Sequence, residues 1–114
     1  MYKELVEKEA LKFSIEHELQ QGRKPLIVTN SGFDIVSGDR QIEVRSKKSD
    51  GNPIVLNYKN IEAIHNQPNF WLYIVYMDNS NKPSFLVKMN KEEIKRRKYE
   101  LIQWSLHDDH TQCC

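Results

Sequence analysis

The fold of this chain is decided by residues 33–45, which read FDIVSGDRQIEVR. Apolar and polar residues alternate on both sides of Gly38-Asp39, a pattern typical of two strands joined by a tight turn. Glycine at the first loop position suits a type II′ turn, because it adopts a positive φ without strain. A two-residue loop also fixes the register, so that Ser37 lies opposite Arg40. The stretch therefore predicts a β-hairpin with a defined pairing.

This pairing places two carboxylates next to each other. The residues expected on the core side are Phe33, Ile35, Ile42 and Val44. Asp34, Glu43 and Arg45 share the other face, because side chains alternate along a strand. Opposed β carbons lie about 5 Å apart, so the carboxylates of Asp34 and Glu43 repel each other unless a cation lies between them. Hard oxygen ligands of this kind suit Mg²⁺ or Mn²⁺. The alternative is an exposed hairpin face with solvated charges and no ligand.

Helices and further strands flank the hairpin. We expect a first helix from Tyr2 to shortly before Gly22 and a second, capped by Asn57, to about Asn66. A third helix should begin with the capping pair Asn90 and Glu93 and continue with the apolar anchors Ile94, Leu101 and Ile102. We expect further strands at residues 26–29, 54–56, 71–77 and 85–87. The order predicts an α/β fold, a mixed β-sheet flanked by helices.

Length and charge bound the class of protein. The chain has 114 residues, 17 basic and 16 acidic side chains and a net charge of +1. We expect a single domain over residues 1–106 and a flexible tail at 107–114. A basic surface for nucleic acid must come from local clustering, since the overall charge is balanced. The longest apolar run is too short for a bilayer and the N-terminus is charged, so we expect no membrane partner and a cytoplasmic location.

Two blocks, residues 32–37 (GFDIVS) and 42–45 (IEVR), resemble the core of the PD-(D/E)XK nuclease superfamily. There an acidic residue, a hairpin turn and then Glu-x-Lys follow one another. Together with Glu18, residues 22–25 and residues 71–76, these blocks resemble the nuclease-like domain at the C-terminus of the plant NO VEIN protein, over about residues 4 to 95. The resemblance implies a restriction-endonuclease-like fold and a Mg²⁺-dependent (or Mn²⁺-dependent) nuclease that hydrolyses DNA phosphodiester bonds.

The resemblance also implies roles for individual residues. Asp34 and Glu43 would bind the metal, with the backbone carbonyl of Val44 as a further oxygen ligand. Arg45 or Lys47 would hold the phosphate or the attacking water. Superfamily members often add a glutamate from the first helix, and both Glu7 and Glu18 are candidates.

Only one of these two glutamates can reach a given metal, because they are separated by about 16 Å along a helix axis. We favour Glu7. A surface glutamate on an amphipathic helix is the alternative for each.

The chain departs from the family pattern at two positions. Arg45 occupies the position where the family pattern has a lysine. Arginine stays charged, so it cannot act as a base, although it can hold a phosphate with two hydrogen bonds. Lys47 lies on the same strand face and is the candidate to replace the lysine. Such domains also carry a glutamate at the start of the following helix, where this chain has Asn60, with Glu62 nearby.

These departures leave other functions open. A second hypothesis is a catalytically inactive nuclease-like module that binds nucleic acid or a partner protein, and a third is an oligomerising accessory domain, for example a homodimer. Weaker candidates are the basic residues of the final helix, the aromatic side chains of Tyr58, Tyr99 and Trp104, and the His107–His110 segment. For each of these a solvated surface, a packing role or a frayed tail is the simpler interpretation.

Overall fold

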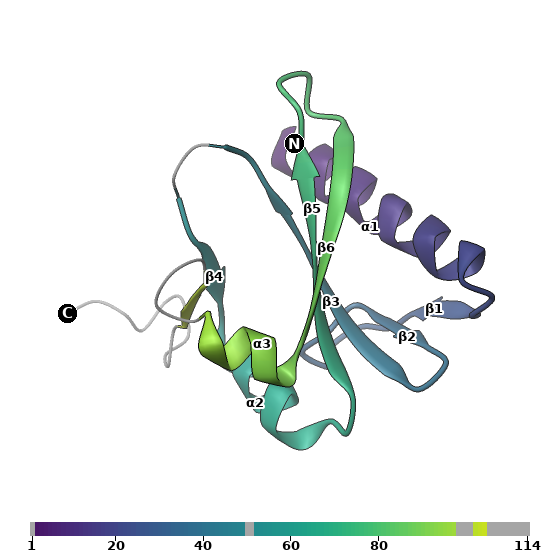
Figure 1. Cartoon of the computed structure of the whole chain (residues 1–114), viewed down its shortest axis with the longest axis vertical. Helices are drawn as coiled ribbons and strands as arrows, with labels where there is room; N and C mark the ends of the chain where they lie inside the picture. Colours follow the sequence, from purple (N-terminus) through teal and green to yellow (C-terminus); the bar gives the residue numbers. More distant parts are fainter. Residues whose placement is uncertain (1, 50–51, 98–101, 105–114) are drawn as a thin grey trace.

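The computed structural model describes residues 2–49, 52–97 and 102–104, and all statements below concern these ranges. A five-stranded sheet of order β1-β2-β3-β5-β6 forms the centre of the molecule (Figure 1). Its strands are β1 (Pro25–Ile27), β2 (Ile35–Ser37), β3 (Arg40–Lys47), β5 (Phe70–Met77) and β6 (Pro83–Asn90). A two-stranded sheet joins β4 (Ile54–Leu56) to β7 (Ile102–Trp104). The helices are α1 (Tyr2–Gln20), α2 (Tyr58–Asn66) and α3 (Lys91–Arg96).

The predicted hairpin and its register are confirmed. Ser37 pairs with Arg40 and Ile35 with Ile42. Gly38 has a φ of 60°, the positive value that the two-residue turn needs. β3 runs parallel to β5 whereas the other pairs in this sheet are antiparallel. The α/β fold with a mixed sheet flanked by helices is therefore confirmed.

Two hydrophobic clusters hold the layers together. On one face of the sheet, Val6 and Ala10 of α1 pack against a group formed by Ile35, Ile42, Val44, Tyr73, Val75 and Met77. On the other face, α2 and α3 bury Ile64 and Ile94 against a group formed by Ile54, Leu56, Phe70, Leu72, Ile74 and Met89. Figure 1 shows α1 on one side of the sheet and the two shorter helices on the other.

The prediction that Phe33 shares the face of Ile35 is wrong. Phe33 packs against the second cluster, on the side of α2 and α3. The reason is that β2 begins only at Ile35, and Gly32 just before it has a φ of 81°. Strand alternation therefore does not extend back to Phe33.

The C-terminal helix is shorter than predicted. The expected capping pair is present, since Asn90 and Glu93 bond to each other's backbone N–H groups at the start of α3. The helix ends at Arg96, however, and Ile102 lies in β7, paired in parallel with Ile54 of β4. The prediction of Ile102 as a helical anchor is wrong, because a long-range strand pairing overrides the local pattern. Leu101, Tyr99 and the tail 107–114 lie outside the described residues.

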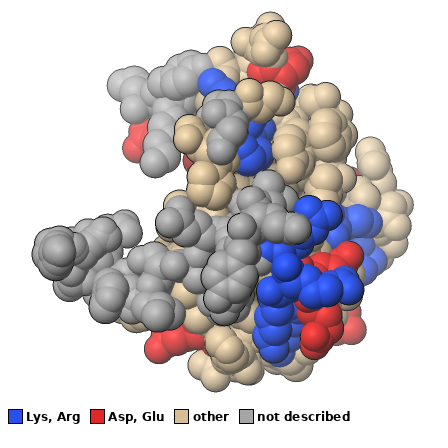
Figure 2. Space-filling view, turned by 60° about the vertical axis from the view of Figure 1, so that its left-hand side comes forward, with Lys and Arg blue, Asp and Glu red and all other residues tan. Residues whose placement is uncertain are grey.

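Surface charges are mixed along α3. This helix carries Lys91, Lys95 and Arg96 together with Glu92 and Glu93. On the face drawn in Figure 2, the largest group of Lys and Arg side chains is likewise interrupted by acidic ones. Among the described residues, no helix combines the length and apolar composition needed to cross a bilayer.

Candidate functional site

One edge of β3 is open. β2 pairs with β3 only from Arg40 to Ile42, so among the described strands residues 43–47 have β5 as their only ladder partner. The backbone N–H of Asp34 donates to the Ile42 carbonyl at 2.8 Å, and before Asp34 the chain turns away. A strand edge with unpaired backbone groups is a place where side chains or ligands must supply partners.

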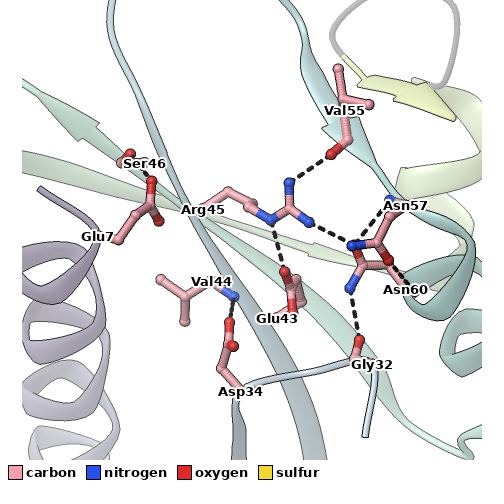
Figure 3. A network of polar contacts seen from close by, with 10 residues as sticks. All are labelled: Glu7, Gly32, Asp34, Glu43, Val44, Arg45, Ser46, Val55, Asn57 and Asn60. Carbon is pink, nitrogen blue, oxygen red and sulfur yellow. Dashed lines mark hydrogen bonds and ion pairs between the residues drawn. The ribbon is translucent and has the colours of Figure 1, made fainter. Parts of the chain in front are cut away.

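Asp34 supplies one of these partners itself. Its Oδ2 accepts a hydrogen bond of 2.8 Å from the Val44 N–H (Figure 3). This bond fixes the carboxylate against the edge of β3. The N–H and the carbonyl of one strand residue point to the same side, so the Val44 carbonyl also faces this edge.

Glu43 lies beside Asp34 and is nearly buried, with 7% of its surface exposed. Burial, and after it the neighbouring Asp34 carboxylate, raise the pKa of Glu43 to about 8, because the opposing effect of the Arg45 guanidinium does not cancel them. The Glu43 carboxyl group therefore keeps its proton up to near-neutral pH. With Glu43 protonated, the Asp34–Glu43 pair carries less negative charge than two ionised carboxylates would.

Arg45 is held by three hydrogen bonds within the protein (Figure 3). Its Nε donates to Glu43 Oε2 at 2.7 Å, its Nη1 to the Val55 carbonyl at 2.6 Å, and its Nη2 to Asn60 Oδ1 at 2.6 Å. The guanidinium thus ties β3 to β4 and to the first turn of α2. In this arrangement all three guanidinium nitrogens have protein partners, so Arg45 acts as a structural tie.

Asn60 is the second centre of this network. It is 3% exposed and forms a reciprocal capping pair with Asn57 at the start of α2. Its Nδ2 donates to the Gly32 carbonyl at 2.9 Å. Gly32 approaches α2 so closely that a Cβ there would collide with the carbonyl of Lys59. The sequence predicted the cap at Asn57, but the contacts of Asn60 with Arg45 and Gly32 join distant segments and left no local signal.

The two candidate glutamates of α1 lie in different places. Glu7 Oε2 accepts from Ser46 Oγ at 2.6 Å and lines a cavity of about 460 Å³ that Asp34 and Glu43 also line. Within the described ranges, no three His, Cys, Asp or Glu side chains gather closely enough to hold a metal ion. Glu7 thus lines the same cavity as Asp34 and Glu43, but it does not lie close enough to both of them to be a third metal ligand.

Glu18 is fully buried at the other end of α1. It accepts hydrogen bonds from the Arg23 guanidinium and, at 2.5 Å, from the Tyr73 hydroxyl. Burial acts to raise the pKa of Glu18, but the hydrogen bonds from Arg23 and Tyr73 outweigh it and hold the pKa at about 2. The idea that Glu18 is a surface glutamate is wrong, since it is an ionised core residue with specific partners.

Lys47 lies further along β3. Its Nζ donates to the Lys48 carbonyl at 2.9 Å, and both lysines line a second cavity of about 400 Å³. Arg45 and Glu7 line this cavity as well as the first one. The open edge of β3 is thus followed by two adjacent cavities. Figure 3 shows α1 on one side of this edge and β4 and α2 on the other.

The fold and this site define an α/β domain with paired carboxyl groups on an open edge of its central sheet. The family model described as "Protein NO VEIN, C-terminal" matches residues 6–89, which is most of the chain. The chain therefore belongs to the NO VEIN C-terminal family. Searches of curated proteins and of solved structures found no match.

Proposed function

We propose that this domain is a nuclease that hydrolyses DNA phosphodiester bonds with the help of Mg²⁺ or Mn²⁺. The observation that carries the proposal is the position of Asp34 and Glu43. Their carboxyl groups lie side by side on an open strand edge, next to the Val44 carbonyl, and line one cavity.

The donor set fits a divalent cation. Asp34, Glu43 and the Val44 carbonyl are hard oxygen ligands, and Mg²⁺ is commonly bound by one or two carboxylates with substrate phosphate and water completing its shell. The raised pKa of Glu43 has two main causes, first the burial of its carboxyl group and then the negative charge of the neighbouring Asp34. A bound divalent cation would compensate this charge, and it would supply Lewis-acid stabilisation of the phosphate and a more acidic water.

The residues of the chain have distinct tasks in this proposal. The Val44 N–H holds the Asp34 carboxylate in place, and the Arg45 guanidinium orients Glu43. Arg45 is a positioning residue here, because its nitrogens bond to Glu43, Val55 and Asn60. Lys47, two residues further along β3, is the basic side chain that would contact the phosphate backbone.

The contacts of Arg45 also favour a second candidate function. The family's usual lysine would be able to position or activate a water, whereas an arginine tied to β4 and α2 does neither. The same domain could therefore bind nucleic acid, or a partner protein, without cleaving it.

A cleavage assay separates the two functions. The protein would be incubated with supercoiled plasmid and with linear DNA, in Mg²⁺, in Mn²⁺ and in EDTA. The nuclease proposal expects metal-dependent cleavage that Asp34→Asn abolishes, while Asp39→Asn, an exposed turn residue, serves as the matched control and keeps activity. Binding without cleavage in all three conditions would favour the inactive module, and cleavage unaffected by Asp34→Asn would show that the site lies elsewhere.

A further inference from the structure

The second cavity on the open edge of β3 has a character of its own. It begins where the first cavity ends, at Glu7 and Arg45, and continues along Ser46, Lys47 and Lys48. Its opposite wall is formed by residues 52–55 and Asn57. The cavity thus lies between the end of β3 and the segment that leads into β4.

The sign of the charge changes from one cavity to the other. The side chains lining the first cavity include four acidic and two basic ones, Glu4, Glu7, Asp34, Glu43, Lys8 and Arg45. Among the described residues, the second cavity is lined by three basic side chains, Arg45, Lys47 and Lys48, and one acidic one, Glu7. The hydrogen bond between Glu7 and Ser46 marks the boundary. A concave site lined by one sign of charge concentrates ligands of the opposite sign.

The walls of the second cavity are held before any ligand arrives. The Arg45–Val55 hydrogen bond fixes the distance between β3 and β4, and Lys47 is paired with Tyr76 in the parallel ladder to β5. The amide side chains of Asn52 and Asn57 add neutral hydrogen-bonding groups to the lining. When the walls of a cavity are already ordered, less free energy is spent on ordering them when a ligand binds.

We propose that this second cavity is a subsite for one phosphate group of a nucleic-acid strand, bound by Lys47 and Lys48 next to the phosphate at the Asp34–Glu43 pair. The inference rests on the proposed function, and deepens it by giving the strand a path along the edge of β3. Arg45 and Lys47 lie two residues apart on one strand face, which corresponds to about 7 Å. The basic side chains of α3 are a weaker choice for the phosphate, because the same short helix carries Glu92 and Glu93.

Binding of a fluorescent single-stranded DNA of twelve nucleotides, measured in EDTA at several salt concentrations, tests this subsite. The double variant Lys47→Gln/Lys48→Gln is compared with a control double variant, Lys12→Gln/Lys82→Gln. The control removes the same charge at exposed positions away from the cavity. We expect the first pair to weaken binding about tenfold and to lower the salt slope by about 1.4, the value for two lost phosphate contacts on a single strand. The control pair should change the affinity less than twofold, and both variants should keep the thermal stability of the wild type.

The outcomes separate this subsite from the function on which it rests. If the Lys47/Lys48 variant bound DNA as tightly as the wild type, the subsite alone would be overturned. The same would follow if both variants weakened DNA binding equally. Absence of DNA binding and of cleavage by the wild type would overturn the proposed function together with the subsite.

Discussion

Arg45 Nη2 donates a hydrogen bond of 2.6 Å to Oδ1 of Asn60, and this bond joins the two positions at which the sequence departs from the nuclease-like pattern. The pattern has a lysine and a glutamate there, and this chain has an arginine and an asparagine. Asn60 also donates to the Gly32 carbonyl, which an ionised glutamate is unable to do. The two substitutions are therefore best understood as one structural change.

Removing the guanidinium should destabilise the fold. Arg45→Ala removes the guanidinium donor from Glu43, the Val55 carbonyl and Asn60, and of these Asn60 keeps the N–H of Asn57 as a donor. We therefore expect a loss of about 2–4 kcal/mol in the free energy of unfolding. Urea denaturation measures this loss. Arg96→Ala, at an exposed position of α3, should change stability by less than about 0.5 kcal/mol. A loss as small in Arg45→Ala as in this control would mean that the three hydrogen bonds contribute little.

The Arg45–Asn60 contact should also be visible as coupling between the two positions. Arg45→Lys alone loses part of the network, and Asn60→Glu alone places a third carboxylate beside Glu43 and removes the donor to Gly32. Each single variant should be destabilised by about 1–3 kcal/mol, and the double variant by less than the sum, because a Lys–Glu ion pair then forms. Strict additivity in the double-mutant cycle would argue against direct coupling.

The hairpin could be predicted because its information is local. A two-residue loop and strict alternation determine which residues pair, and the register of Ile35 with Ile42 follows from these alone. The cap at Asn57 and the capping pair at Asn90 were predictable for the same reason, since each involves residues three positions apart.

The contacts that define the site were not predictable, because they join distant segments. Arg45 bonds to Val55 and Asn60, and Asn60 bonds to Gly32, 28 positions earlier in the chain. The parallel pairing of β4 with β7 likewise depends on tertiary structure and not on local propensity. Glu18 illustrates the same limit, since its position on a helix stripe gave no sign of Arg23 and Tyr73 as partners.

Glu18 should give the protein an acid-dependent stability. Its pKa in the folded state is about 2, below that of an unfolded glutamate, so its contribution is present above pH 4.5 and is lost as the pH falls toward 2. Glu18→Gln should cost about 3 kcal/mol at pH 7, and this difference from wild type should shrink between pH 4.5 and pH 2. Chemical denaturation at a series of pH values measures it, with the exposed Glu16→Gln on the same helix as a control. A difference that stays constant over this range would contradict the ionised, hydrogen-bonded state of Glu18.

Glu43 should have the opposite effect on stability. Its folded pKa of about 8 exceeds that of an unfolded glutamate, so the stabilisation by the protonated form is complete below about pH 4.5 and is lost as the pH rises toward 8. Glu43→Gln keeps an acceptor for Arg45 but removes this dependence. In EDTA we expect the variant to gain about 1–3 kcal/mol relative to wild type between pH 5 and pH 8. The exposed control variant Glu92→Gln should show no such gain. If the free energy of unfolding had the same pH dependence in wild type and in Glu43→Gln, the Glu43 carboxyl group would be ionised throughout this range.

Divalent cations should stabilise the fold through the same carboxyl group. A cation bound at Asp34 and Glu43 takes the place of the Glu43 proton, so binding should be tighter at pH 8 than at pH 6.5. At ten times its Kd the ion adds about 1.4 kcal/mol, which raises the Tm of a domain of this size by about 5 °C. Differential scanning fluorimetry in Mg²⁺ or Mn²⁺, against sodium chloride of equal ionic strength, measures the shift. Asp34→Asn should abolish it and Asp39→Asn should keep it. Because phosphate oxygens complete many Mg²⁺ sites, the titration is repeated with a short DNA present. An unchanged Tm in both titrations would leave the Asp34–Glu43 pair as a structural contact that binds no cation.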